Sequence, residues 1–344
     1  MKPELNETLK KIENHFKNPN AEIDKSVIDL LFRERLFKCF LPNELNGLNL
    51  SLTETMKIIR ETAFINGSLG WLIQIGNGGN YFASCFPETI SKELFTPLSA
   101  VIAGSGAPSG SAEKTATGYL LSGTWRYCSG ADYAGLFTVS FICPESREQL
   151  AAILTKGQVE VIRDWRTSGL SQTSTHSICL DQVEVNEKFV FNVMEQLCYL
   201  ENPVFQMPFV VYAQAFFLQV VLGISSRFLS ETRKFINYKQ RHWTTTFPNR
   251  LETCIANTYR LEEQIQHMSR RIDEMTLSLI ESNDAKLLEM NYRTELIFLT
   301  KQLRELIHEV YWDLGIEVVY KDHPIHLVYQ DFLVCTQHYL LREY

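Results

Sequence analysis

GYLLSGTWRYCSGADYAG, residues 118–135, is the most informative stretch of this sequence. It alternates from Tyr119 onward, as a pleated strand does when successive side chains point to opposite faces. The alternation ends at Ser129-Gly130, which predicts a turn directly after an aromatic face. Such a face beside a small hydroxyl residue indicates a site for a planar ligand. The residues expected on this face are Tyr119, Leu121, Gly123, Trp125 and Tyr127.

Length and composition restrict the class of protein. A chain of 344 residues is long enough for two or three domains and a sizeable core. The formal net charge of -7 argues against a nucleic-acid partner or an anionic membrane surface. The eight cysteines are scattered without a C-x-x-C pair, which is typical of reduced thiols in the cytoplasm. The charged start MKPELNETLKKIENHF is not a signal peptide. We therefore expect a cytoplasmic protein.

Hydrophobic periodicity divides the chain into three regions and predicts an α+β fold. Residues 1–99 carry apolar residues at helical spacing, and Ser51-x-x-Glu54 has the form of a capping box. Residues 100–198 change to short strands separated by Gly, Ser and Pro, which predicts a β domain. Residues 199–344 are helical again and predict a bundle, in which residues from Leu251 to Leu279 form the apolar seam of one long helix. Within it, PFVVYAQAFFLQVVLGI is shorter than the roughly 20 residues of a membrane span, so we expect a buried helix.

Several catalytic and metal-binding motifs are absent or incomplete. AGSGAPSG is expected to be a glycine-rich loop between strands, but it lacks the dinucleotide-binding spacing. No G-K-[ST] phosphate loop or G-x-S-x-G hydrolase motif occurs. Glu305-x-x-His308 occurs once, whereas di-iron carboxylate sites need the motif twice with two further glutamates. His323 and His326 flank a proline near a predicted turn, where capping is the simpler interpretation. No metal site is predicted.

Longer phrases of the sequence resemble the acyl-CoA dehydrogenase superfamily, particularly its flavin-dependent monooxygenase branch. GYLLSGTWRYCSGADYA is similar to the family phrase G-Y-x-[LV]-S-G-x-W-x-[FY]-x-S-G. INGSLGW, AGSGAPSGSA and DWRTSGLSQTSTHSICLDQVEV match segments before and after it, and HPIHLVYQDFLVCTQH resembles the last helix. The resemblance implies an N-terminal helical domain (1–99), a middle β-barrel or sandwich domain (100–198) and a C-terminal four-helix bundle (199–344).

The resemblance also implies a flavin, FAD or FMN, held between the β domain and the bundle. By analogy with the family, Ser129 and Gly130 would hydrogen-bond the ring edge, because a ring carrying carbonyls and nitrogens needs fixed donors there. Arg241 stands where an arginine reaches the cofactor phosphate, often across a dimer interface. The other residues that match flavin- or substrate-side positions are Ser105, Ser111, Trp125, Tyr127, Trp165 and Thr173.

The function implied is the oxygenase component of a two-component monooxygenase, which hydroxylates a small substrate with O2 and reduced flavin from a separate reductase. His338, seven residues after Asp331, matches a histidine beside the flavin in that branch, and an imidazole titrating near neutrality suits proton transfer. Family members form dimers or tetramers through the bundle, so the apolar helix from Phe209 to Ile224 is a candidate for a subunit interface.

Departures from the family pattern leave two alternatives open. The glutamate base of acyl-CoA dehydrogenases is missing from the stretch after Asp331, and the usual R-x-x-x-R-D reads His326-Leu-Val-Tyr-Gln-Asp331. One alternative is a divergent acyl-CoA dehydrogenase that desaturates an acyl thioester with a base from another helix. The other is a non-catalytic binding protein whose flavin site has decayed.

Overall fold

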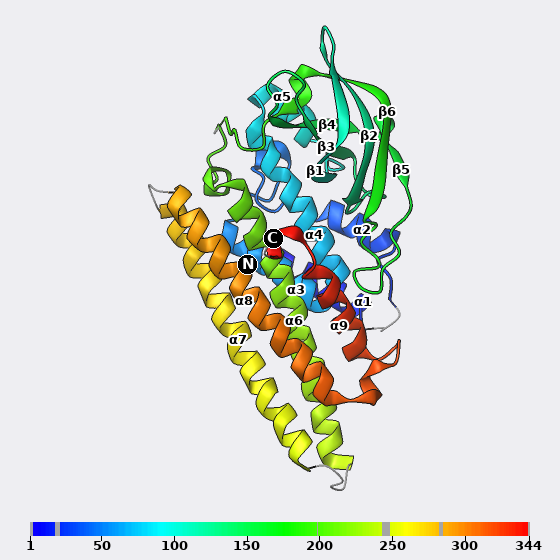
Figure 1. Cartoon of the computed structure of the whole chain (residues 1–344), viewed down its shortest axis with the longest axis vertical. Coiled ribbons are helices and arrows are strands. Elements are labelled where there is room, and N and C mark those ends of the chain that lie inside the picture. The colour runs from blue at the N-terminus through cyan, green and yellow to red at the C-terminus, as the bar shows by residue number, and fades with distance from the viewer. Residues whose placement is uncertain (1–2, 18–20, 198, 243–247, 282–284, 343–344) are drawn as a thin grey trace.

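The computed structural model describes residues 3–17, 21–197, 199–242, 248–281 and 285–342. Helices at both ends of the chain enclose one end of a β domain, and an elongated helical bundle extends away from it (Figure 1). The order of elements is helices, strands, then helices, as the periodicities predict. The α+β fold class is therefore confirmed.

The N-terminal region consists of helices that pack under the β domain. Ser51 begins the third helix with the predicted capping box: its Oγ accepts from the Glu54 amide at 3.2 Å, and the Glu54 carboxylate accepts from the Ser51 amide at 3.1 Å. The helices are α1 (Pro3–His15), α2 (Lys25–Arg33), α3 (Leu52–Ile65), α4 (Gly67–Asn80) and α5 (Glu88–Phe95).

Helix α4 lies where the N-terminal region, the β domain and the bundle meet, and it contacts α3, α6, α9 and β1. Small residues allow this close packing. A Cβ atom at Gly70 would lie 2.4 Å from the Cα atom of Ala63 on α3, so only glycine fits there. The backbone of α4 is thereby fixed close to its neighbours.

The β domain is a seven-stranded sheet in the order β5-β6-β2-β1-β3-β4-β7. Strand β1 joins its two halves: Ile102 to Ser105 run parallel to β3, whereas Ser111 to Lys114 run antiparallel to β2, with a register shift between. The strands are β1 (Ile102–Lys114), β2 (Gly118–Cys128), β3 (Leu136–Ile142), β4 (Gln149–Thr155), β5 (Glu160–Ile162), β6 (His176–Asn186) and β7 (Val190–Phe191).

Two predictions about the β domain were wrong. The glycine-rich phrase AGSGAPSG is not a loop but part of β1, and Gly110 is needed because a Cβ there would lie 2.1 Å from the Trp125 ring. The predicted aromatic face of β2 is also not one surface. Trp125 is 0% exposed, whereas Tyr127 is 64% exposed with a backbone φ of +66°. A register shift between Trp125 and Cys128 ends the alternation and turns Tyr127 outward.

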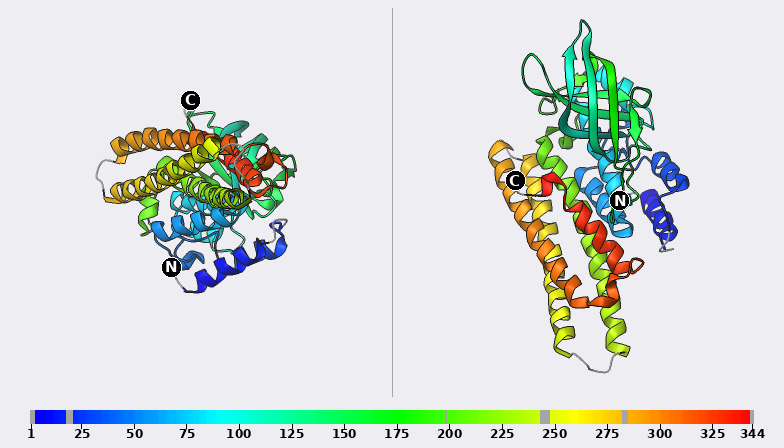
Figure 2. Two further views of the ribbon diagram at one scale, coloured as in Figure 1. Left: turned by 90° about the horizontal axis from the view of Figure 1, so that it is seen from below. Right: turned by 45° about the vertical axis from the view of Figure 1, so that its right-hand side comes forward.

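The bundle contains α6 (Phe209–His242), α7 (Pro248–Glu281), α8 (Ala285–Leu314) and α9 (Pro324–Cys335). Helices α6, α7 and α8 run side by side along the long axis (Figures 1 and 2), and the shorter α9 packs against α6. Most of the predicted seam of α7 is buried: Ile255 is half-buried, and the buried members are Thr258, Leu261, Ile265, Met268, Ile272 and Met275.

Helix α6 is longer than the apolar phrase predicted. Among the described residues, Phe209–Gln240 alone is long and apolar enough to cross a membrane, but 83% of its most apolar window is buried inside the protein. The prediction of a buried helix is confirmed. Because a single chain already covers Val211, Phe216 and Leu218, the segment from Phe209 to Ile224 is core rather than a free interface face. The seven described cysteines form no disulfide.

Candidate functional site

The turn after β2 is attached to α4 by hydrogen bonds between side chains. Ser129 is 4% exposed, and its hydroxyl accepts from the indole N–H of Trp71 at 2.9 Å. The same hydroxyl lies 2.8 Å from the Thr175 hydroxyl. Gly130 continues the turn with a φ of +80°, which favours glycine, and its amide donates to the Thr173 carbonyl at 2.9 Å.

A chain of hydroxyl groups extends from this turn to the loop before β6. The hydroxyls of Thr175 and Thr173 are 2.7 Å apart, and Thr173 donates to the carbonyl of Leu170 at 2.8 Å. The indole N–H of Trp165 donates to the same carbonyl at 2.9 Å. The structure thus brings four predicted site residues together, since Ser129, Gly130, Thr173 and Trp165 belong to one hydrogen-bonded network.

A cavity of about 380 Å³ lies next to α4, between the sheet, the start of α6 and the C-terminal segment. Its volume falls within the range of small-molecule sites. Two predicted site residues line it: Ser105 from β1 and His338 from the segment after α9. Most other lining groups are apolar or aromatic, and the residues used below are Gln74, Gly78, Phe82, Gln149, Phe209, Tyr212, Phe217 and Tyr339.

His338 is held in place by aromatic contacts and a backbone hydrogen bond. Its ring stacks on Phe217, with centroids 3.9 Å apart and planes at 27°, and meets the edge of Trp71 at 5.8 Å. Its Nδ1 accepts from the Leu340 amide at 3.4 Å, so the neutral ring carries its proton on Nε2. Burial lowers the pKa of His338 to about 4, because the charged ring would lose hydration. The expectation of titration near neutrality was therefore wrong.

Trp71 connects the turn to the cavity. Its indole N–H donates to Ser129 while its ring touches His338, so both groups of predicted residues are parts of one site. The sequence phrase INGSLGW marked this tryptophan but gave no role for it. Gln74 and Phe217 were not predicted as site residues. Their helical spacing in α4 and α6 is equally typical of core residues.

The remaining predicted residues lie elsewhere. Trp125 belongs to the core of the β domain, where its indole donates to the Ser140 carbonyl at 2.8 Å, so it presents no face to a ligand. Tyr127 and Ser111 are exposed on the β domain, and the Ser111 hydroxyl donates to the Ser122 carbonyl at 3.3 Å. Arg241 lies in the last turn of α6, and its side chain is outside the described residues.

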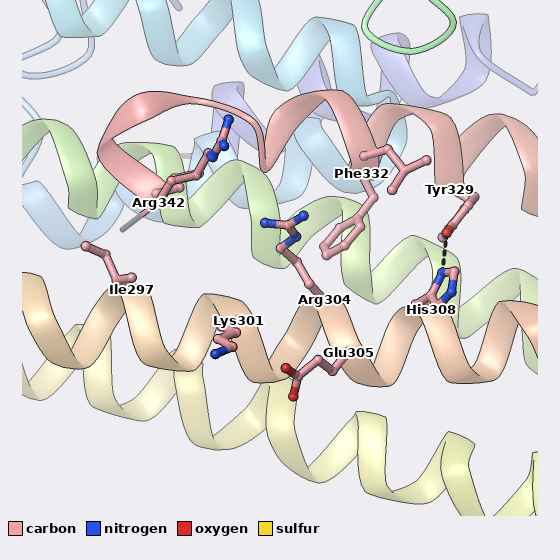
Figure 3. Close-up of a pocket in the computed structure, with 10 residues that line it drawn as sticks. Ile297, Lys301, Arg304, Glu305, His308, Tyr329, Phe332 and Arg342 are labelled. Atoms are coloured by element: carbon pink, nitrogen blue, oxygen red, sulfur yellow. Dashed lines mark hydrogen bonds between the residues drawn. The ribbon is translucent and has the colours of Figure 1, made fainter. Parts of the chain in front are cut away.

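A second hollow, of about 450 Å³, lies between α8 and α9 (Figure 3). His308 there makes a 2.8 Å hydrogen bond through Nδ1 to the Tyr329 hydroxyl, while Glu305 points towards α7. The Glu-x-x-His motif is therefore a feature of helix packing. Within the described parts of the chain, no group of three or more His, Cys, Asp or Glu residues could hold a metal. His323 caps α9 by accepting from the Ile325 amide at 3.2 Å, which confirms the capping interpretation.

Comparison with known proteins identifies the fold. The structure superposes on the HsaA monooxygenase from M. tuberculosis with a TM-score of 0.87 and 17% identity, covering 98% of this chain and 93% of that one. For 3-HSA hydroxylase from Rhodococcus sp. RHA1 the TM-score is 0.86 at 15% identity, with 98% and 92% covered. The chain therefore has the acyl-CoA dehydrogenase-like fold that the sequence resemblance implied.

Sequence comparison is in agreement. The chain is 29% identical over 213 residues to an indole-3-acetate monooxygenase of Pseudomonas putida, covering 61% of this chain and 54% of the relative. It is 24% identical over 241 residues to a dibenzothiophene monooxygenase of Rhodococcus erythropolis, covering 61% and 55%. The chain thus spans about half the length of the curated relatives it matches. No family model matches the sequence.

Proposed function

We propose that this chain is the oxygenase component of a two-component monooxygenase that hydroxylates a small aromatic substrate with O2 and reduced flavin. The observation that carries the proposal is the meeting of Ser129, Trp71 and His338 beside an aromatic-lined cavity. The curated relatives support it, since their names describe monooxygenases of indole-3-acetate and dibenzothiophene. An aromatic substrate suits the ring-lined cavity.

The residues at the junction fit the edge of a flavin. The ring system carries carbonyls and nitrogens on one side and is flat and apolar elsewhere, and the cavity offers the Ser105 hydroxyl beside aromatic rings. The Ser129 hydroxyl is hydrogen-bonded to Trp71 and Thr175, so it supports the turn beside this site. Gly106 leaves its backbone approachable, because a Cβ there would meet only the Tyr339 hydroxyl, at 3.7 Å. When bound, a reduced flavin supplies the O2-activating chemistry.

The protein's own side chains would orient the reactants and exclude water. Phe217 and Trp71 keep the His338 ring fixed, and its Nε2–H can donate to a bound oxygen atom without the ring becoming charged. Dehydrogenation of an acyl thioester requires a carboxylate base instead. Among the described residues that line the cavity there is this imidazole but no carboxylate, so the geometry favours the oxygenase over the dehydrogenase alternative.

The cofactor and the partners are also part of this proposal. One structural neighbour, XiaF, holds FADH2 and another, TdsC, holds FMN. We propose that the cofactor is reduced flavin of either kind, delivered by a separate reductase in the cytoplasm. We also propose that the chain forms a homodimer or a homotetramer. An arginine at position 241 could then reach the cofactor phosphate of a neighbouring subunit.

A reduced-flavin titration separates the three functions. Purified protein is titrated anaerobically with FMNH2 or FADH2 and then mixed with O2 and indole, and the hydroxylated product and H2O2 are measured. The oxygenase should bind reduced flavin and yield product. Bleaching of oxidised flavin by an acyl-CoA, without hydroxylation, would establish the dehydrogenase. No binding of either flavin would establish the non-catalytic alternative.

A further inference from the structure

The side-chain amide of Gln74 is buried, and its carbonyl oxygen accepts no hydrogen bond from the described residues. It lies on α4, close to one turn after Trp71, and is 2% exposed. Its Oε1 has no hydrogen-bond partner, although buried polar groups are almost always paired. The side chain lines the 380 Å³ cavity. An unpaired carbonyl oxygen on a buried side chain that lines a cavity can accept from a donor that arrives from outside the chain.

The surroundings of Gln74 restrict that donor to a flat molecule. Aromatic rings of Phe82, Phe209 and Tyr212 line the same cavity. Beside the amide, a Cβ atom at Gly78 would lie 3.7 Å from Gln74 Nε2, so the glycine leaves room next to it. A planar apolar ring with one N–H or O–H on its edge would fill this space and pair the amide.

Two other glutamines do not offer a buried, unpaired acceptor on this cavity. Gln149 also lines the cavity, but its side chain is exposed, and its Nε2 donates to the Gly106 carbonyl at 2.8 Å. Gln214 has an unpaired Oε1 too, but it does not line the cavity, and its Nε2 donates to the Leu340 carbonyl at 2.8 Å. Gln74 is thus the glutamine of this cavity whose buried amide carbonyl has no hydrogen-bond partner.

We propose that Gln74 is a specificity-determining residue that accepts a hydrogen bond from the ring N–H or O–H of a bicyclic aromatic substrate. This inference rests on the proposed function, because it concerns the substrate of the same site. In this proposal a residue of α4 orients the substrate, whereas His338 lines the cavity from the C-terminal segment. An apolar ring of the same shape would leave the Gln74 carbonyl unpaired.

The test compares indole with indene, which has nearly the same shape but a CH2 group in place of N–H. Binding to the flavin-free full-length protein is measured by calorimetry. We expect wild type to bind indole about tenfold more tightly, the effect of about 1.4 kcal/mol for a hydrogen bond. Gln74→Met keeps the side-chain length and should abolish the preference by weakening indole alone. Gln149→Met, the same change on the same cavity, should preserve the indole-to-indene ratio.

Each outcome decides the inference. Equal binding of indole and indene by wild type, no binding of either, or a preserved preference in Gln74→Met overturns it. The wild-type comparison suffices even where Gln74→Met does not fold. If reduced flavin binds and both compounds are oxidised equally, the proposed function stands and the inference falls. If the indole preference holds but no flavin binds, the inference stands and the proposed function falls.

Discussion

Asp331 on α9 accepts a hydrogen bond from the backbone amide of Leu170, with 2.6 Å between Oδ1 and N. The carbonyl of Leu170 in turn accepts from Trp165 and Thr173. One carboxylate therefore fixes a loop that carries two of the predicted flavin-side residues. The sequence analysis used Asp331 as the aspartate of a family pattern and as the position from which His338 was located, and it predicted no contact for this side chain.

Replacing Asp331 tests this connection. Asp331→Ala leaves the Leu170 amide without an acceptor and should cost about 1 to 3 kcal/mol of stability, with weaker flavin binding. Asp331→Asn retains a carbonyl acceptor and should restore most of both. The measurements are urea unfolding and a reduced-FMN titration. Flavin binding by Asp331→Ala at the wild-type affinity would show that the loop needs no such anchor.

The charge of Asp331 predicts a pH dependence of stability. Burial raises its pKa to about 6, while the backbone hydrogen bond from Leu170 and the charge of Arg227 oppose the rise. Because the folded pKa exceeds the unfolded value, the contribution of Asp331 is greatest below about pH 4 and is lost as pH rises through 6. The difference in unfolding free energy between wild type and Asp331→Asn should change across this window. A constant difference from pH 4 to 7 would contradict the raised pKa.

Ser129 is predicted to matter for stability as well as for flavin binding. Ser129→Ala leaves the buried indole N–H of Trp71 unpaired, which should cost about 1 to 3 kcal/mol. Thr175→Val removes a neighbouring hydroxyl but keeps the bond between Trp71 and Ser129, so it serves as the control. Urea unfolding and a flavin titration give both effects, and flavin affinity should fall modestly, by about 1 kcal/mol. A smaller loss in Ser129→Ala than in Thr175→Val would refute this role.

The sequence predicted the elements better than their contacts. The capping box at Ser51 and the seam of α7 follow from local chemistry and helical spacing, and both were correct. The outward turn of Tyr127 was missed because a register shift adds a residue to one strand without changing the pattern of residue types.

The site itself depends on contacts between distant segments. The bond from Trp71 to Ser129 spans 58 residues and that from Leu170 to Asp331 spans 161. No local spacing encodes such pairs, so the sequence located Ser129 and His338 only through the family resemblance. Gln74 was missed because one glutamine in an apolar helix looks like any core polar residue until the cavity beside it is seen.

Exposed apolar side chains at the end of α8 are candidates for the subunit contact of the proposed assembly. Trp312 on α8 is 74% exposed and Ile316 in the following turn is 77% exposed. Exposed aromatic and aliphatic groups of this size are typical of subunit contacts. Light scattering at micromolar concentration should give a dimer or tetramer, and Trp312→Glu with Ile316→Glu should reduce the mass towards one chain. A monomeric wild type would remove both the assembly and a role for Arg241 in a neighbouring subunit.

The last prediction concerns His338, whose buried imidazole should act in its neutral form. With its pKa lowered to about 4, the ring stays uncharged from pH 5.5 to 8, so hydroxylation should show no step near 6.5 that depends on this residue. His338→Ala should retain reduced-flavin binding but divert O2 to H2O2, because the Nε2–H donor is lost. His338→Gln, which can still donate, should recover part of the coupling between O2 consumption and product. The ratio of hydroxylated product to H2O2, measured against pH for all three proteins, tests this role. If His338→Ala couples as well as wild type, the histidine only packs against Phe217; if a wild-type step near 6.5 disappears in His338→Ala, the ring titrates and its role is proton transfer.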